Sequence, residues 1–169
     1  MTQLAERLDA LTATVFAPDQ RIEGRVRGVT VDVRFHEPDL HRHLGAEALG
    51  HQLERLLSLV AVARVRTRRE ILTEFGFEHR ALEHTDARYQ RFRRAASELR
   101  GAGASHDRAV AVATIGLRAF KVRLEPKPVR DMSETEFRQA FRAASSAMIA
   151  DYTLKSKLLK NEMLGAAGS

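Results

Sequence analysis

Apolar positions in the first third of the chain change from a helical spacing to an alternating one. Over residues 2–15 they recur every three or four positions, which predicts a short amphipathic helix. These positions are Leu4, Leu8, Leu11 and Val15. From Ile22 to Phe35 apolar and polar residues alternate, with two glycines as breaks. That pattern predicts two or three short antiparallel strands with one covered face.

A long helical stripe follows Pro38, which ends the last of these strands. From about Ala46 to Phe75 the apolar residues keep to one helical face, and the helix they predict is about 45 Å long. The stripe consists of Leu49, Leu53, Leu56, Leu57, Val60, Ile71 and Phe75. Arg64 falls in its middle, where an aliphatic residue is expected. Because an unpaired buried guanidinium is costly, we expect Arg64 to meet a carboxylate or carbonyl, or to lie at an edge with its stem buried.

The second half of the chain repeats this order of patterns. Residues 86–100 predict another short helix, closed by the run Gly101-Ala102-Gly103, and residues 109–124 predict a second set of strands. The run Ser133-Glu134-Thr135-Glu136 has the form of a capping box, with serine as the cap and glutamate at the third helical position. We therefore expect the last long helix to begin there and to run to about Met163.

A fixed offset of 88 residues superimposes the two halves. It pairs Gly28 with Gly116, Glu37-Pro38 with Glu125-Pro126, and the apolar stripes of the helices, whereas the strands match at an offset of 89. A one-residue insertion in the loop between strand and helix is expected to absorb this slip. A chance alignment is the alternative, because binary patterns are generic. The shared offset favours a tandem duplication, with a first repeat at 1–83 and a second at 84–169.

The order short helix, antiparallel strands, Glu-Pro and long helix resembles the YbaB/EbfC family of small bacterial nucleoid-associated proteins. The resemblance covers both halves, about 80 residues each, and rests on the pattern of elements. Members of that family are homodimers built around a two-fold axis, so it implies an α+β fold of two tandem helix–antiparallel strands–long helix repeats arranged as a pseudo-dimer. The chain itself is then expected to be a monomeric pseudo-dimer or a homodimer. Some relatives are linked with type VII secretion and not with DNA.

Composition narrows the classes of protein that fit. The chain has no Cys, which excludes disulfides and thiolate metal sites, and no run of the roughly 20 apolar residues that a membrane span requires. We expect a cytoplasmic protein. The net charge of +6 is uneven: residues 1–83 carry 12 basic and 13 acidic side chains, and residues 84–169 carry 16 and 9. Such an asymmetry favours polyanionic partners.

Eight arginines form two clusters that are candidates for nucleic-acid binding. One cluster lies late in the first long helix and the other in the following short helix. They are Arg64, Arg66, Arg68, Arg69, Arg88, Arg91, Arg93 and Arg94. Guanidinium groups grip phosphates, so these clusters are suited to follow a DNA backbone without reading bases. The alternative is a solvated helix face that is merely rich in arginine. Lysines at 155, 157 and 160 add a third basic group.

The sequence gives little support for a metal site or a catalytic site. The histidines His36, His41, His43 and His51 fit no standard ligand spacing, and the second half has other residue types at the equivalent positions. There is no nucleophile motif and no Gly-rich phosphate loop. The recurring Glu37 and Glu125 are read as turn residues at strand ends. We expect no enzyme, no metal and no cofactor.

Two functions remain. The first is a low-specificity DNA-binding protein of the bacterial nucleoid, with duplex DNA as partner. The second is a protein-interaction role, for example as an accessory factor or chaperone of a type VII secretion system, because a basic amphipathic surface suits acidic proteins as well as DNA.

Overall fold

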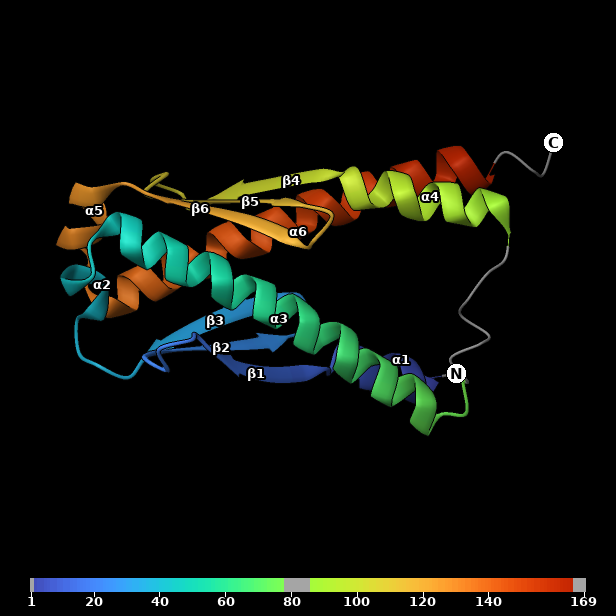
Figure 1. Ribbon diagram of the computed structural model, residues 1–169, viewed down its shortest axis with the longest axis horizontal. Helices are drawn as coiled ribbons and strands as arrows, with labels where there is room; N and C mark the ends of the chain where they lie inside the picture. Colours follow the sequence, from blue (N-terminus) through green and yellow to red (C-terminus); the bar gives the residue numbers. More distant parts are fainter. Residues whose placement is uncertain (1, 78–85, 166–169) are drawn as a thin grey trace.

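The computed structural model describes residues 2–77 and 86–165. Within these ranges it is an α+β fold with two three-stranded antiparallel sheets and six helices, so the predicted fold class is confirmed at that level. The long helices α3 and α6 lie between the two sheets (Figure 1). The elements of the first half are α1 (Thr2–Asp9), β1 (Thr12–Phe16), β2 (Ile22–Arg27), β3 (Thr30–Phe35), α2 (Leu40–His43) and α3 (Ala46–Glu74).

The second half has the same order of elements. In both sheets, strands that lie next to each other are also consecutive in sequence. Each sheet is therefore a simple meander, with orders β1-β2-β3 and β4-β5-β6. The elements are α4 (Ala87–Glu98), β4 (Arg100–Ala104), β5 (Val110–Ile115), β6 (Ala119–Leu124), α5 (Pro126–Asp131) and α6 (Glu134–Leu164). Ser133 caps α6 by accepting a hydrogen bond from the Glu136 amide at 3.1 Å, which confirms the predicted capping box.

Strand pairing shows where the two sequence offsets arise. Arg27 pairs with Thr30 and leaves two residues in the first hairpin turn, whereas Ile115 pairs with Ala119 and leaves three. The extra residue of the second half therefore lies in its hairpin turn. The link from the third strand to the long helix is one residue longer in the first half, which restores the offset of 88. The sequence interpretation located only this second change.

The first strand of each half was missed by the sequence analysis. The predicted helix over residues 2–15 ends at Asp9, and residues 12–16 form β1. Leu11 and Val15 are four positions apart, a spacing that puts two side chains on one face of a helix and equally on one face of a strand. The ambiguity is inherent in the pattern.

The glycine run after α4 is also part of a strand and not a helix stop. Gly101 and Gly103 lie in β4, which packs directly on α6. A Cβ at Gly101 would come within 2.8 Å of the Tyr152 Cβ, and one at Gly103 would overlap with backbone atoms of α6. These glycines thus let the strand backbone approach the helix closely.

The long helix of each half packs against an edge strand of the sheet in the other half. We call this contact the seam: α3 packs along β6, and α6 packs along β3. Glu54 on α3 accepts the Val122 amide at 3.0 Å, and Arg138 on α6 donates to the Val33 carbonyl at 2.6 Å. Edge groups that would otherwise need a further strand are satisfied by side chains. Both halves share one buried core as a result.

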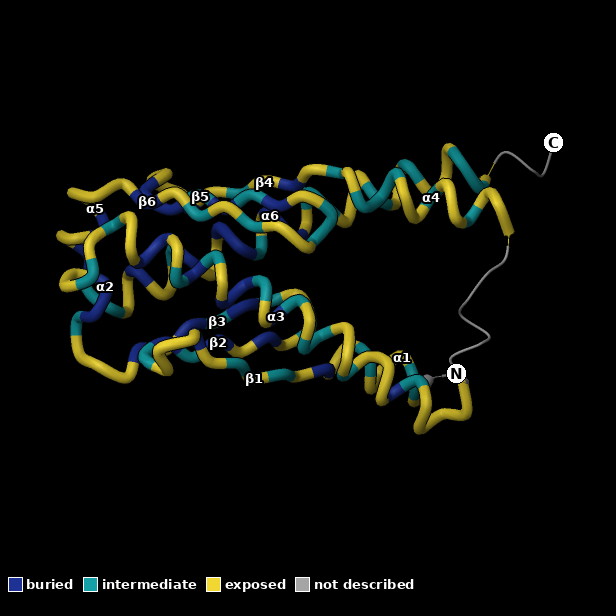
Figure 2. Tube along the Cα trace, in the orientation of Figure 1, coloured by how far each residue is buried: buried dark blue, intermediate teal, exposed yellow. Residues whose placement is uncertain are grey.

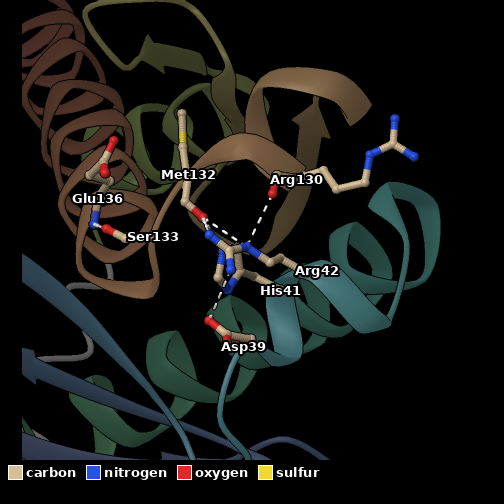
Figure 3. Close-up of polar contacts among 7 residues, drawn as sticks. All are labelled: Asp39, His41, Arg42, Arg130, Met132, Ser133 and Glu136. Atoms are coloured by element: carbon tan, nitrogen blue, oxygen red, sulfur yellow. Dashed lines mark hydrogen bonds and ion pairs between the residues drawn. The ribbon is translucent and has the colours of Figure 1, made fainter.

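Helices α2 and α5 join the halves at one end of the molecule (Figure 1), and Figure 3 shows the polar contacts at this junction. Arg42 donates to the carbonyls of Met132 at 2.9 Å and Arg130 at 3.1 Å. The buried His41 contacts the rings of Phe35 and Phe137, which also contact each other, and its Nε2 lies 2.8 Å from the Met132 carbonyl. A carbonyl only accepts, so Nε2 carries the proton.

Two helical arms project from the opposite end (Figure 1). The first arm consists of α1 and the C-terminal part of α3 from residue 60, and the second of α4 and the C-terminal part of α6 from residue 150. Most of their residues are exposed or half-buried, in contrast to the body between the sheets (Figure 2). The arms therefore add little to the buried core.

Candidate binding site: the arms and the cleft at their base

The two predicted arginine clusters lie on different arms. Residues Arg64, Arg66, Arg68 and Arg69 belong to α3 in the first arm, and Arg88, Arg91, Arg93 and Arg94 belong to α4 in the second. Figure 1 shows these two helix segments well apart, on either side of the fork. The structure thus keeps each cluster together and does not merge them into one patch.

The cluster on α4 is open to solvent. All four arginines are exposed, and α4 has no buried residue. Its first turn is capped by Asp86, which accepts from the Arg88 amide at 2.9 Å. Arg91 donates weakly to the Ala87 carbonyl at 3.4 Å, and among the described residues none of the four forms an ion pair. Their charge is therefore available to a partner.

The cluster on α3 is partly neutralised. Arg66 forms an ion pair with Glu70 at 3.2 Å, one helical turn away. Arg68 and Arg69 are exposed, and their side chains have no hydrogen bond or ion pair within residues 2–77 and 86–165. Of the third basic group, Lys155 is paired with Asp151 at 2.9 Å and donates to the Arg100 carbonyl at 3.0 Å.

Two environments were predicted for Arg64: contact with a carboxylate or carbonyl, or a place at an edge with its stem buried. The structure has the second. Arg64 is half-buried at the edge of an apolar cavity of ≈ 100 Å³ between the helices and sheets. In the part of the chain that the structure describes, its guanidinium has no hydrogen bond or ion pair. Burial lowers the pKa of this guanidinium, and the neighbouring charge of Arg68 acts in the same direction. Arginine stays protonated regardless, so a partly desolvated charge remains without a counterion.

A cleft of ≈ 1020 Å³ opens at the base of the fork, between α3 and the β5–β6 turn. Apolar side chains contribute much of its wall: Val62 is 68% exposed and Val65 52%, and Leu117 reaches in from the turn. Sequence reasoning missed this cleft. The available signal was two valines outside the buried stripe of α3, but Leu117 joins them only through the tertiary fold.

The charges around the cleft favour an anionic occupant. Its two carboxylates are both held by arginine, because Glu70 pairs with Arg66 and Glu74 pairs with Arg7 at 3.3 Å. Arg69 and Arg118 also line the cleft, and neither makes a side-chain hydrogen bond or ion pair with any described residue. The cleft therefore combines an apolar wall with unpaired positive charge.

His36 and His41 belong to the histidine group that the sequence analysis did not interpret as a metal site, and they have separate surroundings. His41 is buried against two phenylalanines, while the exposed His36 lies 3.3 Å from Glu23. Among the described residues, no three His, Cys, Asp or Glu side chains are grouped so that they could hold a metal ion.

The two glutamates before proline lie at strand ends, as expected of turn residues. Glu37 forms a two-pronged pair with Arg21 at 2.9 and 3.0 Å, and these hydrogen bonds hold the pKa of its carboxyl below the usual value. Glu125 precedes α5 and makes no capping hydrogen bond through its side chain.

No described helix is both long and apolar enough to cross a membrane.

Comparison with known proteins gives no match at any level: no family model, no curated protein and no solved structure matches the chain. The function must therefore be argued from the arms and the cleft themselves.

Proposed function

We propose that this is a non-enzymatic protein that binds duplex DNA with little sequence preference through the arginines of its two arms. The observation that carries the proposal is the set of exposed guanidinium groups without ion-pair partners, four on α4 together with Arg68 and Arg69 on α3. Both arms project from the same end of the molecule, so one extended polyanion can contact both (Figure 1).

The chemistry of these groups favours contact with the DNA backbone. Guanidinium forks bind phosphate oxygens, and such contacts position a protein on DNA without specifying sequence. The aromatic residues of α4, Tyr89 and Phe92, are half-buried and lie against each other, with ring centroids 6.0 Å apart. Base stacking is therefore not part of the proposed contact.

The crossed packing of the halves supports the resemblance to the YbaB/EbfC family. If each half corresponds to one subunit of a YbaB-like dimer, the seam takes the place of the subunit interface and the chain acts as a monomeric pseudo-dimer. In that reading the protein works at the bacterial nucleoid.

A salt series tests the proposal by gel shift on several unrelated duplexes. Counterion release makes the logarithm of affinity fall with the logarithm of salt by about 0.9 per neutralised phosphate. Replacing Arg88, Arg91 and Arg94 together by Gln should flatten this slope by up to about three units and weaken all duplexes alike. The matched control replaces Arg34, Arg123 and Arg130, which are equally exposed but lie away from the arms, and should leave the slope nearly unchanged.

Three results would contradict the proposal. If the wild-type protein fails to bind even at low salt, the protein-interaction role becomes the better assignment. Equal effects of the two triple variants would mean that the arms are not the contact surface. Tight binding to one duplex alone would require a base-reading element.

A further inference from the structure

The cleft at the base of the fork has a feature that phosphate binding leaves unused, namely its apolar wall. Val62 and Val65 expose more than half of their surface, on the face of α3 that points away from its buried stripe. An exposed valine is ordinary when isolated, but these two line one hollow together with Leu117. Contiguous exposed apolar surface with a polar rim is typical of a docking site.

The cleft runs along α3. Its lining residues on that helix extend from Ser58 to Glu74 at spacings of three and four, which is one continuous face. At 1.5 Å per residue this face is about 24 Å long. A second helix packs at 8–10 Å from such a face by placing its side chains in the grooves. A volume of ≈ 1020 Å³ provides room for the apolar side chains of a helix.

Charge selects among possible helices. Arg69 and Arg118 line the cleft without a partner among the described residues, while both carboxylates of the cleft are already paired. A basic helix would meet like charge at both arginines.

We propose that this cleft docks an amphipathic helix of a partner protein, with leucine-like residues against Val62, Val65 and Leu117 and carboxylates toward Arg69 and Arg118. The mode is helix-in-groove recognition, in which apolar anchors every three or four residues give affinity and charges give orientation. This site uses none of the α4 arginines but shares Arg69 with the proposed DNA contact, and its apolar anchors are what separates the two proposals.

The test uses a fluorescein-labelled synthetic peptide of about 18 residues, five helical turns, with leucine on one face and glutamate elsewhere. Fluorescence polarisation with the full chain should show saturable binding of this peptide. One control peptide has lysine in place of every glutamate, and another has the same composition with the leucines scattered around the helix. Neither control should bind with comparable affinity.

Variants locate the site. Replacing Val62 and Val65 together by Ser should weaken the acidic peptide about 10- to 100-fold, because each side chain loses apolar area that binding would bury. Val29→Ser is the matched control, since Val29 is 54% exposed but lies in the β2–β3 turn, and it should change nothing. Arg118→Met keeps the aliphatic stem and removes the charge, and should weaken binding about tenfold.

The outcomes separate the two proposals. The Val62 and Val65 double variant should bind DNA as the wild type does, so loss of peptide binding alone identifies the cleft. Equal binding of the acidic peptide to wild type and double variant, or equal binding of the clustered and scattered peptides, would show mere charge attraction and overturn the inference. So would undiminished binding by Arg118→Met together with tight binding of the lysine peptide.

Discussion

Gly103→Ala tests the close contact between β4 and α6. The added Cβ would overlap with the backbone nitrogen of Met148 and the carbonyl oxygen of Ala144, and would come within 2.7 Å of the Ala147 Cβ. No side-chain rotation relieves an overlap with backbone atoms. Strand β4 must therefore move away from α6, and the packing between the two elements opens.

The size of the effect follows from this geometry. Overpacking of a core costs about 1–3 kcal/mol where side chains adjust, and Gly103→Ala should lie at or above the upper end because the neighbours are backbone. A loss of about 3 kcal/mol is a large part of the 5–15 kcal/mol typical of a domain. At this chain length it corresponds to a fall in melting temperature of about 6–12 °C.

Urea unfolding followed by far-UV circular dichroism measures this loss. Two control variants are compared with Gly103→Ala for their loss of stability. Ala102→Val changes the neighbouring exposed residue and should stay within about 0.5 kcal/mol of wild type. Gly24→Ala would meet only the Leu56 side chain, at 3.0 Å, and should cost less than Gly103→Ala. A Gly103→Ala variant as stable as wild type would show that β4 does not rest on α6 as described.

Further variants test the seam, Arg64 and one turn. Glu54→Leu leaves the Val122 amide unpaired and should lower the free energy of unfolding by about 1–3 kcal/mol. Glu54→Gln keeps an acceptor and should cost less. Equal losses for the two variants in urea melts would refute the role of that hydrogen bond. Arg64→Leu should melt at the same or a higher temperature than wild type, because it replaces an unpaired half-buried charge beside an apolar cavity; a clear fall in a thermal scan would reveal a structural partner. Hydrogen bonds from Ser105 and the Ala109 amide lower the pKa of Asp107, so the stability it contributes is present at neutral pH and is lost as pH falls below about 4. Asp107→Asn should lose roughly 0.5–1 kcal/mol at pH 7 and show a weaker acid dependence in urea melts from pH 7 to pH 3; an unchanged profile would contradict this assignment.

Long periodic segments were the predictable part of this fold. The stripes of α3 and α6 and the alternation of β2 and β3 report burial directly, because one face of each element is covered. Short β1 escaped because a four-residue spacing fits both a helix and a strand. Strand β4 escaped because its two glycines are explained by α6, an element that follows about 30 residues later.

The site was predictable only in part, for the same physical reason. Runs of arginine are visible in the sequence, but their division between two arms depends on how the helices pack. The apolar cleft joins α3 of the first half to Leu117 of the second, and no local pattern links those residues. A solvent-facing valine such as Val65 can be recognised as part of a cleft only when its neighbours in the fold are known.

The seam has a consequence for synthesis of the chain on the ribosome. Val33 is satisfied by Arg138, 105 residues later, and Glu54 by Val122, 68 residues later. Translation at about 5–20 residues per second therefore leaves the edge of β3 uncovered for seconds, with the apolar face of α3 awaiting its second sheet. Pairing across such sequence distances is intrinsically slow. Nascent chains truncated before residue 138 should accordingly bind general chaperones, and should be released once α6 has been made.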